Sequence, residues 1–146
     1  MIALQFVEYN LLIWLIFKPF RLRWASGRPL ETRTLIVIFD RFDVVRVPFP
    51  FTDQPAHKHR PALILSPAAF NQPAGHSVMA MITSAQHSAW PLDSVITDLA
   101  TAGLPAPSIV RFKLFTLDHR LVLGVLGHLA HTDQNRIRAA LTCLLA

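Results

Sequence analysis

Residues 42–67 read FDVVRVPFPFTDQPAHKHRPALILSP, and this stretch decides how the chain folds. Two apolar segments, Val44–Phe49 and Ala62–Leu65, flank a polar loop, Thr52–His59. Their β-branched and apolar composition predicts two short strands. Arg60 follows the loop at the mouth of the second strand. A permanent positive charge with a planar fork is well suited to bind phosphate at such a place.

The rest of the chain continues this pattern of short elements. Three further strands are predicted: Ser77–Thr83, Ser108–Phe112 and Val122–Leu129, the last with two glycines that indicate a bend or a close backbone approach. Leu35–Phe39 is a strand or the tail of a linker, and Leu114–Asp118 is expected to carry on from the strand Ser108–Phe112 into a short turn or 3₁₀ segment. Thr132 is expected to cap a final helix, Asp133–Leu145. The sequence therefore predicts a mainly β, α+β fold: a small, partly open β-barrel with a C-terminal helix.

The composition indicates a globular chain with room for one domain. It has 146 residues, of which 52% are hydrophobic and 16% are charged, and this excludes general disorder. The formal net charge of +5 suggests an anionic partner. However, residues 1–39 hold five basic and two acidic residues, whereas residues 40–146 hold nine and seven. The high charge alone is therefore weak evidence for nucleic-acid binding.

Residues 1–39 are interpreted as an N-terminal extension and linker, and residues 40–146 as the functional domain. The apolar run Leu11–Phe17 is shorter than the roughly 18 residues needed to span a bilayer. Its positive charges follow the run instead of preceding it, unlike a secretory signal. No membrane association is expected, although a membrane-surface anchor remains an alternative.

Cys143 is the only cysteine, so no disulfide can form within the chain. This agrees with a reducing, cytoplasmic location. Because Cys143 lies in an apolar run, it is expected to be a buried small hydrophobe.

Several polar residues are candidates for a functional site. The run His57, Lys58, His59 and Arg60 crowds four groups able to carry positive charge into one loop, which suits a polyanion or a solvated basic turn. Thr83 and Ser84 end an apolar strand, where hydroxyl groups form turns or contact ligands. The remaining candidates are Gln86 and Lys113.

No cofactor or metal is expected. The histidine pairs His57/His59 and His128/His131 lack a matching set of acidic or cysteine ligands. A Ser-His-Asp triad is not supported by a nucleophile-elbow pattern.

Four segments resemble, in order and spacing, the MazF/PemK family of toxins. They are FDVVRVPFPFTDQ from Phe42, HRPALILSP from His59 with Asn71 after it, MITS from Met81, and PSIVRFKLFTLD from Pro107, followed by LGHLAHTDQNRIRAAL. The resemblance covers residues 42–145. Phe42 stands where the family usually has Gly, and Lys113, Leu114 and Phe115 fill a stretch where Arg or Gln is common.

The resemblance implies an SH3-like barrel and a cytoplasmic homodimer that cleaves single-stranded RNA without a metal. Its products would carry a 2′,3′-cyclic phosphate and a 5′-hydroxyl, and its inhibitor would be an antitoxin protein. By position, Arg60 and Thr83 match the family's catalytic residues. The implied substrate contacts are His57, Lys58, His59, Ser84, Gln86 and Lys113, with bases stacked on Phe51 or Trp90.

Two alternatives remain open from the sequence. A similar barrel occurs in CcdB-type toxins, which bind gyrase and are not enzymes; such a protein does not need Arg60 or Thr83. The other alternative is an inactive copy of the family, because residues 1–39 precede the first barrel strand.

Overall fold

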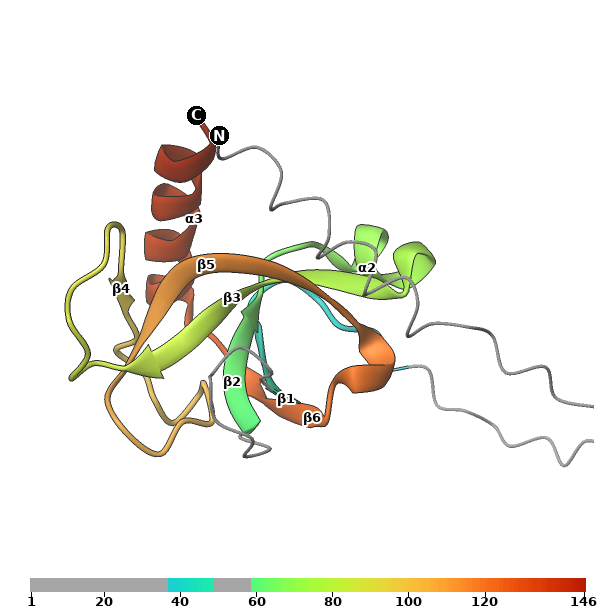
Figure 1. The fold of residues 1–146 in the computed structure, drawn as a ribbon, viewed down its shortest axis with the longest axis horizontal. Coiled ribbons are helices and arrows are strands. Elements are labelled where there is room, and N and C mark those ends of the chain that lie inside the picture. Colours follow the sequence, from blue (N-terminus) through green and yellow to red (C-terminus); the bar gives the residue numbers. More distant parts are fainter. Residues whose placement is uncertain (1–36, 49–58) are drawn as a thin grey trace, which may run out of the picture. The chain divides into compact units, whose positions relative to one another are not determined.

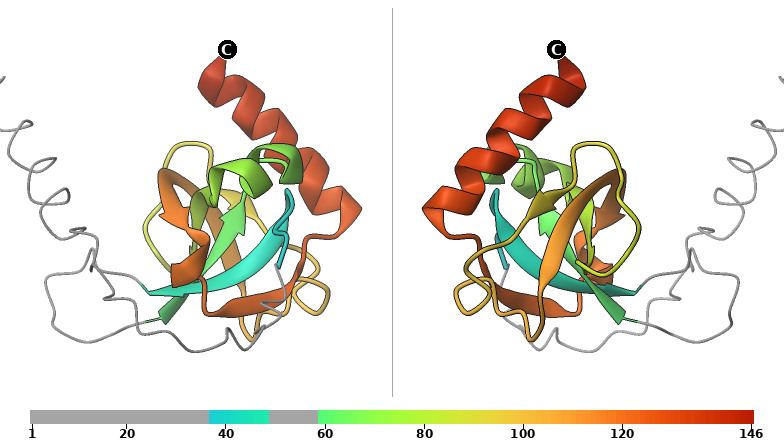
Figure 2. Two further views of the ribbon diagram at one scale, coloured as in Figure 1. Left: turned by 90° about the vertical axis from the view of Figure 1, so that its right-hand side faces the viewer. Right: turned by 90° about the vertical axis from the view of Figure 1, so that its left-hand side faces the viewer.

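The computed structural model describes residues 37–48 and 59–146, which form a curled antiparallel sheet and two α-helices (Figure 1). The strands are β1 (Asp43–Pro48), β2 (His59–Ile64), β3 (His76–Ser84), β4 (Ser94–Val95), β5 (Ser108–Asp118) and β6 (Gly124–His128). They pair in the order β4-β5-β3-β2-β1-β6. The sheet curls into a half-barrel (Figure 2), which confirms the predicted partly open barrel.

Each strand predicted between residues 44 and 129 is present, with its ends shifted by a few residues. Leu114–Asp118, expected to carry on into a short turn or 3₁₀ segment, belong to β5, which extends beyond the predicted strand Ser108–Phe112. They pair with His76–Ala80 of β3, a partner that the local pattern does not reveal. The 3₁₀ segment comes directly afterwards, at His119–Leu121, where the side chain of Asp118 accepts a hydrogen bond from the backbone of Arg120.

Helix α2 (Ala68–Ala74) was not predicted from the sequence. It follows Pro67, contains Pro73 and has only seven residues, too few to show a helical period. It ends at Gly75, whose left-handed φ of 63° closes the helix before β3 begins.

Helix α3 (His131–Leu145) confirms the predicted C-terminal helix but starts at His131. The expected cap at Thr132 is wrong, because Ala130 holds the cap position without a side-chain bond. Asp133 makes the stabilising contacts of this first turn. It is 1% exposed and accepts hydrogen bonds from the backbone and hydroxyl of Thr97, at 3.0 and 2.7 Å, and from the backbone of Asp98. These bonds fix the start of α3 to the segment after β4.

The prediction that Cys143 is buried is wrong, because its side chain is exposed. Only Asp133 and Ile137 of α3 are buried, and both lie in its first half. The C-terminal half projects beyond the sheet (Figures 1 and 2), so Cys143 has no core to enter.

Two apolar clusters fill the two faces of the sheet, as strand alternation requires. The neighbours Val44 and Val45 belong to different clusters. The cluster under α3 includes Leu63, Ile82 and Ile137. The other cluster consists of Phe39, Val45, Val47, Ala62, Ile64 and Met79, all 4% exposed or less.

The predicted close approach at the glycines of residues 122–129 is confirmed. A Cβ atom on Gly127 of β6 would lie 2.4 Å from the carbonyl oxygen of Thr101. Gly103, with φ of 67°, lies in the same loop as Thr101 and approaches the backbone of Leu126. The loop before β5 therefore packs backbone to backbone against β6, which only glycine allows.

Other predictions concern residues that lie partly or wholly outside the described part of the chain. Val37–Phe39, the described part of Leu35–Phe39, is not a strand. Residues 1–36 and the loop residues Phe51, His57 and Lys58 lie outside the described residues. In the described part of the chain, neither helix combines the length and the apolar character needed to cross a membrane.

Candidate functional site

A pocket opens where strands β2 and β3 separate. The two strands pair through Ile64–Met79, Leu63–Ala80 and Ala62–Met81, and their pairing ends there. Each then continues on its other neighbour alone: β2 reaches His59 on β1, and β3 reaches Ser84 on β5.

Pro61 explains this separation. The carbonyl of Ile64 accepts a bond from Phe42 ahead of β1, whereas the backbone N–H of Leu65 donates to Val78 on β3. Because backbone groups alternate along a strand, residue 61 faces β3, as Leu65 does. A proline there has no N–H to donate, so the ladder to β3 loses its next bond.

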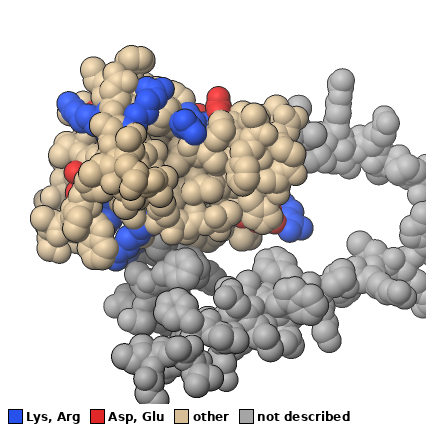
Figure 3. Space-filling model, turned by 90° about the horizontal axis from the view of Figure 1, so that it is seen from above, with Lys and Arg blue, Asp and Glu red and all other residues tan. Residues whose placement is uncertain are grey.

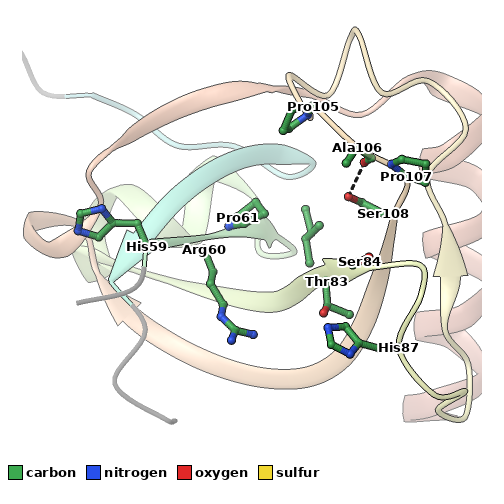
Figure 4. A pocket seen from close by; sticks show the side chains of 11 residues that line it. His59, Arg60, Pro61, Thr83, Ser84, His87, Pro105, Ala106, Pro107 and Ser108 are labelled. Carbon is green, nitrogen blue, oxygen red and sulfur yellow. Dashed lines mark hydrogen bonds between the residues drawn. The ribbon is translucent and has the colours of Figure 1, made fainter. Parts of the chain in front are cut away.

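The pocket has a volume of about 330 Å³ and lies between these strand ends and the loop before β5 (Figure 4). Its lining consists of His59, Arg60, Pro61, Ile82, Thr83, Ser84, His87, Pro105, Ala106, Pro107 and Ser108. Figure 4 shows the Arg60 side chain extending away from β2 into the space beside Thr83 and His87.

Arg60 and Thr83 lie on the same face of the sheet. Arg60 is two residues before Ala62 on β2 and Thr83 is two residues after Met81 on β3, so both lie on the face of the paired residues Ala62 and Met81. Both line the pocket between the separated strand ends. Ala62, Ile64 and Met79 of this face belong to a buried cluster, so the two polar side chains extend from a rigid base.

Short hydrogen bonds shape the rest of the pocket. The hydroxyl of Ser108 donates to the carbonyl of Ala106 at 2.8 Å, and the backbone of Ala85 donates to Pro107 at 3.1 Å. These bonds hold the proline-rich segment 105–107, which lines one side of the pocket, against the end of β3. The backbone of His87 donates to the carbonyl of Ser84 at 3.3 Å, and this turn brings His87 back to the pocket.

The structure brings together four of the residues selected from the sequence: His59, Arg60, Thr83 and Ser84. Gln86 is exposed and does not line the pocket. Lys113 does not line it either, and its Nζ atom lies 4.6 Å from the ring centre of Trp90. Sequence reasoning missed His87, because only the turn after Ser84 places it at the pocket.

Among the described residues, several of the basic side chains outside the pocket are paired with carboxylates. Salt bridges join Arg111 to Asp93, Arg120 to Asp118 and Arg136 to Asp133. On the face shown in Figure 3, Lys and Arg side chains are spread over a mostly uncharged surface instead of forming one patch. This face of the described residues therefore presents no single basic patch to an anion.

The pocket combines a guanidinium, three hydroxyls and two imidazoles. Such a set can hold an anionic group by charge and hydrogen bonds, and it can donate or accept a proton. Within residues 37–48 and 59–146, no three His, Cys, Asp or Glu side chains are close enough together to hold a metal ion.

The one hydrogen bond between serine and histidine side chains among the described residues lies elsewhere. Ser77 is fully buried, and its Oγ atom is 2.8 Å from Nε2 of His119. A substrate cannot reach this buried hydroxyl, so the pair is structural.

Solved structures of known proteins share this fold. The chain resembles MazF in the MazE–MazF complex (form III) of Deinococcus radiodurans, with 27% identity and a TM-score of 0.59 over 75% of this chain and 97% of that one. It also resembles an endoribonuclease from a mycobacterial species, solved with its cognate antitoxin. Here the identity is 19% and the TM-score 0.57, over 74% of this chain and 93% of the other, and this likeness shows the fold alone. Among curated proteins, none matches the sequence.

The sequence match covers most of the chain. Residues 40–145 match the family described as PemK-like, MazF-like toxin of type II toxin–antitoxin systems. The four segments that resembled this family in the sequence lie within the matched residues. The chain therefore belongs to the PemK-like, MazF-like family of type II toxin–antitoxin toxins.

Proposed function

We propose that this protein is a cytoplasmic toxin that cuts single-stranded RNA at the pocket between β2 and β3. The observation that carries the proposal is that Arg60 and Thr83 line one pocket at the separated ends of these strands. A cation and a hydroxyl on one face can hold two oxygens of a single phosphodiester. The family match and the endoribonuclease with the same fold support this choice of substrate.

The reaction that suits these groups is an internal transesterification. The 2′-oxygen of the ribose attacks the adjacent phosphorus, a new P–O2′ bond forms, and the bond from phosphorus to the 5′-oxygen breaks. The 2′-hydroxyl loses its proton, and the leaving 5′-oxygen gains one. The products are a 2′,3′-cyclic phosphate and a 5′-hydroxyl. Arg60 stabilises the negative charge that develops on the phosphate, and Thr83 donates a hydrogen bond to a phosphate oxygen.

His87 is the pocket side chain that we assign to proton transfer. Histidine is the residue that most often carries protons in enzymes, and His87 borders the same hollow as Arg60 and Thr83. We prefer His87 to Arg60 for this step, because a guanidinium rarely gives up its proton.

The partners follow from the same assignment. The active form is proposed to be a homodimer, and an antitoxin protein with an acidic segment is proposed to cover the pocket in the resting cell. The mycobacterial endoribonuclease was solved with its cognate antitoxin, and MazF of Deinococcus radiodurans with MazE. The gyrase-binding alternative has no use for a pocket built around Arg60 and Thr83.

The test uses the purified full chain with a long unstructured RNA in EDTA, and primer extension maps the cuts. Discrete cuts are expected. Arg60→Ala should slow cleavage by about 10²–10³-fold, the usual loss when one transition-state charge contact is removed. A matched control is Arg46→Ala, because Arg46 lies opposite Pro61 on β1 but does not line the pocket.

Three outcomes separate the possibilities. Cleavage lost in Arg60→Ala but kept in Arg46→Ala supports the proposal. Equal cleavage by the chain and Arg60→Ala removes Arg60 from the mechanism. Intact RNA with a folded chain contradicts the enzyme assignment and favours an inactive member of the family.

A further inference from the structure

A chain of side-chain hydrogen bonds connects the start of β1 to the start of α3 through the exposed ring of His128. The Nδ1 atom of His128 lies 2.8 Å from a carboxylate oxygen of Asp43, its partner on β1. The Nε2 atom of the same ring lies 3.2 Å from the side-chain nitrogen of Gln134, in the first turn of α3. Both nitrogens of the ring are therefore engaged, each by a different neighbouring element.

The other bonds of Gln134 fix the orientation of its amide. Its nitrogen donates to the carbonyl oxygen of Leu129 at 2.8 Å, and its oxygen accepts from the guanidinium of Arg138 at 3.3 Å. Exchanging the two amide atoms would set oxygen against oxygen and nitrogen against nitrogen. The group that faces His128 is therefore an N–H donor, and Nε2 of the ring accepts its bond. A ring that accepts at Nε2 is neutral and carries its proton on Nδ1, where it donates to Asp43.

A proton added to His128 makes its two contacts unequal. A cationic imidazole carries an N–H group on both nitrogens. The bond from Nδ1 to the carboxylate of Asp43 then becomes charge-assisted and stronger. At Nε2, the new N–H group points at the N–H group of Gln134, so two donors face each other without an acceptor. Gln134 cannot turn its oxygen toward the ring without losing its bond to Leu129.

Charged groups from three elements surround the ring. The segment that leads into β1, the loop packed on β6, and α3 carry the titratable and charged side chains Asp40, Arg41, Asp43, Asp98, His131, Asp133 and Arg138. The backbone bond from Ala68 is the main cause of the lowered pKa of Asp40, and positive charge on His128 lowers it further. The carboxylates beside β1 therefore favour a charged ring, whereas the bond from Gln134 favours a neutral one.

We propose that His128 is a pH-sensitive latch at the start of α3. With a neutral ring the latch is closed, and Gln134 holds α3 to the end of β6. A proton on the ring opens the latch: His128 stays with Asp43, Gln134 turns away, and the first turn of α3 loses this attachment. Histidine is suited to the task because its charge ordinarily changes between about pH 5 and pH 8.

The latch adjoins the segment that supports the pocket. The backbone N–H of His128 donates to the carbonyl of Thr101 at 3.0 Å, and Asp133, next to Gln134, holds Thr97. The chain continues from there to residues 105–107, which line the pocket. Opening of the latch is expected to stay local, because the bonds of Asp133 do not involve the ring.

The test is an NMR titration of the full chain from pH 8 to pH 5. At pH 8, the nitrogen shifts of His128 should show a proton on Nδ1 and none on Nε2. As the ring takes up a proton, the side-chain amide signals of Gln134 should shift in the same step. The opening constants of the backbone amides of residues 134–136, corrected for the intrinsic pH dependence of exchange, should rise by about 2-fold to 10-fold, as expected for one lost hydrogen bond. The amides of β6 should keep their protection, because Asp43 retains the ring.

Three variants separate the latch from other titrating groups. His128→Gln cannot take up a proton and should remove the pH dependence of the opening constants. His131→Gln is the matched control, because His131 belongs to the same junction but its ring lies 3.4 Å from Asn135, on α3 itself. It should keep the pH dependence. Gln134→Glu should reverse its sign, since a carboxylate accepts a bond from the protonated ring.

The titration of the unaltered chain decides the proposal even where a variant fails to fold. A proton on Nε2 of His128 at pH 8 would overturn it, and so would Gln134 signals that do not follow the ring. An unchanged pH dependence in a folded His128→Gln would also overturn it. Loss of the dependence in His128→Gln together with its retention in His131→Gln supports the latch.

Discussion

Strand β3 has a hydroxyl residue and a histidine at each of its ends, but the two ends differ in nearly every other respect. At its start, Ser77 is fully buried and bonded to His119. At its end, Thr83 borders an open pocket with the exposed His87. Among the described residues, no hydrogen bond engages the side chain of Thr83 or His87. Similar residue types thus lie in opposite environments at the two ends of one strand.

The closed end of β3 belongs to a network in which each polar group has a partner. The backbone of Val78 donates to the hydroxyl of Ser66, which donates to the side-chain oxygen of Asn71. The amide nitrogen of Asn71 donates to the carbonyls of Phe39 and Ser66, each at 2.9 Å. A buried network in which each polar group has a hydrogen-bond partner stabilises the fold. The open end retains hydrogen-bonding capacity for a ligand, so the difference separates residues that hold the structure from residues that can act on a substrate.

The largest effect on stability is expected at the closed end, from Asn71→Leu. Asn71 is fully buried, and leucine has a similar size but cannot bond to Ser66 or Phe39. The buried groups left without partners should lower the free energy of unfolding by about 2–4 kcal/mol. Urea denaturation measures this loss.

The control for Asn71→Leu lies at the open end. Ser84→Ala removes an exposed hydroxyl and should change the free energy of unfolding by less than about 0.5 kcal/mol. Equal losses in the two variants would mean that the ends of β3 do not differ in the way that their hydrogen bonds indicate.

The next effect is on activity and concerns Thr83→Val. This change keeps the shape of the side chain and removes its hydroxyl. On the proposed mechanism, cleavage should slow by about 100-fold because one hydrogen bond to the phosphate is lost. The free energy of unfolding should change by less than about 0.5 kcal/mol, and Thr83→Ser should retain much of the activity. Single-turnover cleavage together with urea denaturation measures both quantities.

Ser77→Ala is expected to have the opposite effects to Thr83→Val: a loss of stability and no loss of cleavage rate. It removes the bond to His119 and should cost about 0.5–1.5 kcal/mol of stability without slowing cleavage. A rate loss in Ser77→Ala as large as that in Thr83→Val would place the chemistry at both ends of the strand and contradict the comparison.

The same contrast explains what sequence reasoning could find. Arg60 and Thr83 were identified because each lies next to a predicted strand end and matches, by position, a catalytic residue implied by the family resemblance. Both line the pocket. His87 was missed because its position depends on a turn held by Ser84. The extension of β5 beyond Phe112 depends on pairing with β3, which lies far away in the sequence.

The errors at the helices have related causes. Helix α2 is too short and too rich in proline for a helical period to show. Cys143 lies in an apolar run, but burial depends on where α3 leaves the sheet, and no local pattern contains that information. Apolar composition predicted the core of the sheet well and predicted poorly the surface of an element that projects from it.

The smallest effect is a pH dependence at the closed end. Burial lowers the pKa of His119 below its usual 6.5, although the nearby Asp118 opposes this shift. His76, the other titratable group beside it, lowers the pKa further. The unfolded chain therefore binds a proton at His119 more readily than the folded chain does. The stability from neutral His119 is fully present above about pH 6.5 and is lost as the pH falls below that value, by at most about 1.4 kcal/mol per pH unit.

Comparing the chain with His119→Phe by urea denaturation from pH 8 to pH 5 isolates this contribution. The variant should lose stability less steeply on acidification, because phenylalanine cannot take up the proton. Asp118 does not interfere, since its hydrogen bond with Arg120 lowers its pKa to about 2, and the stability it provides is lost only as the pH falls through that lower range. Parallel curves for the two proteins would show that His119 accepts its proton without opening the network, and the closed end of β3 would then be less tightly packed than its buried hydroxyl indicates.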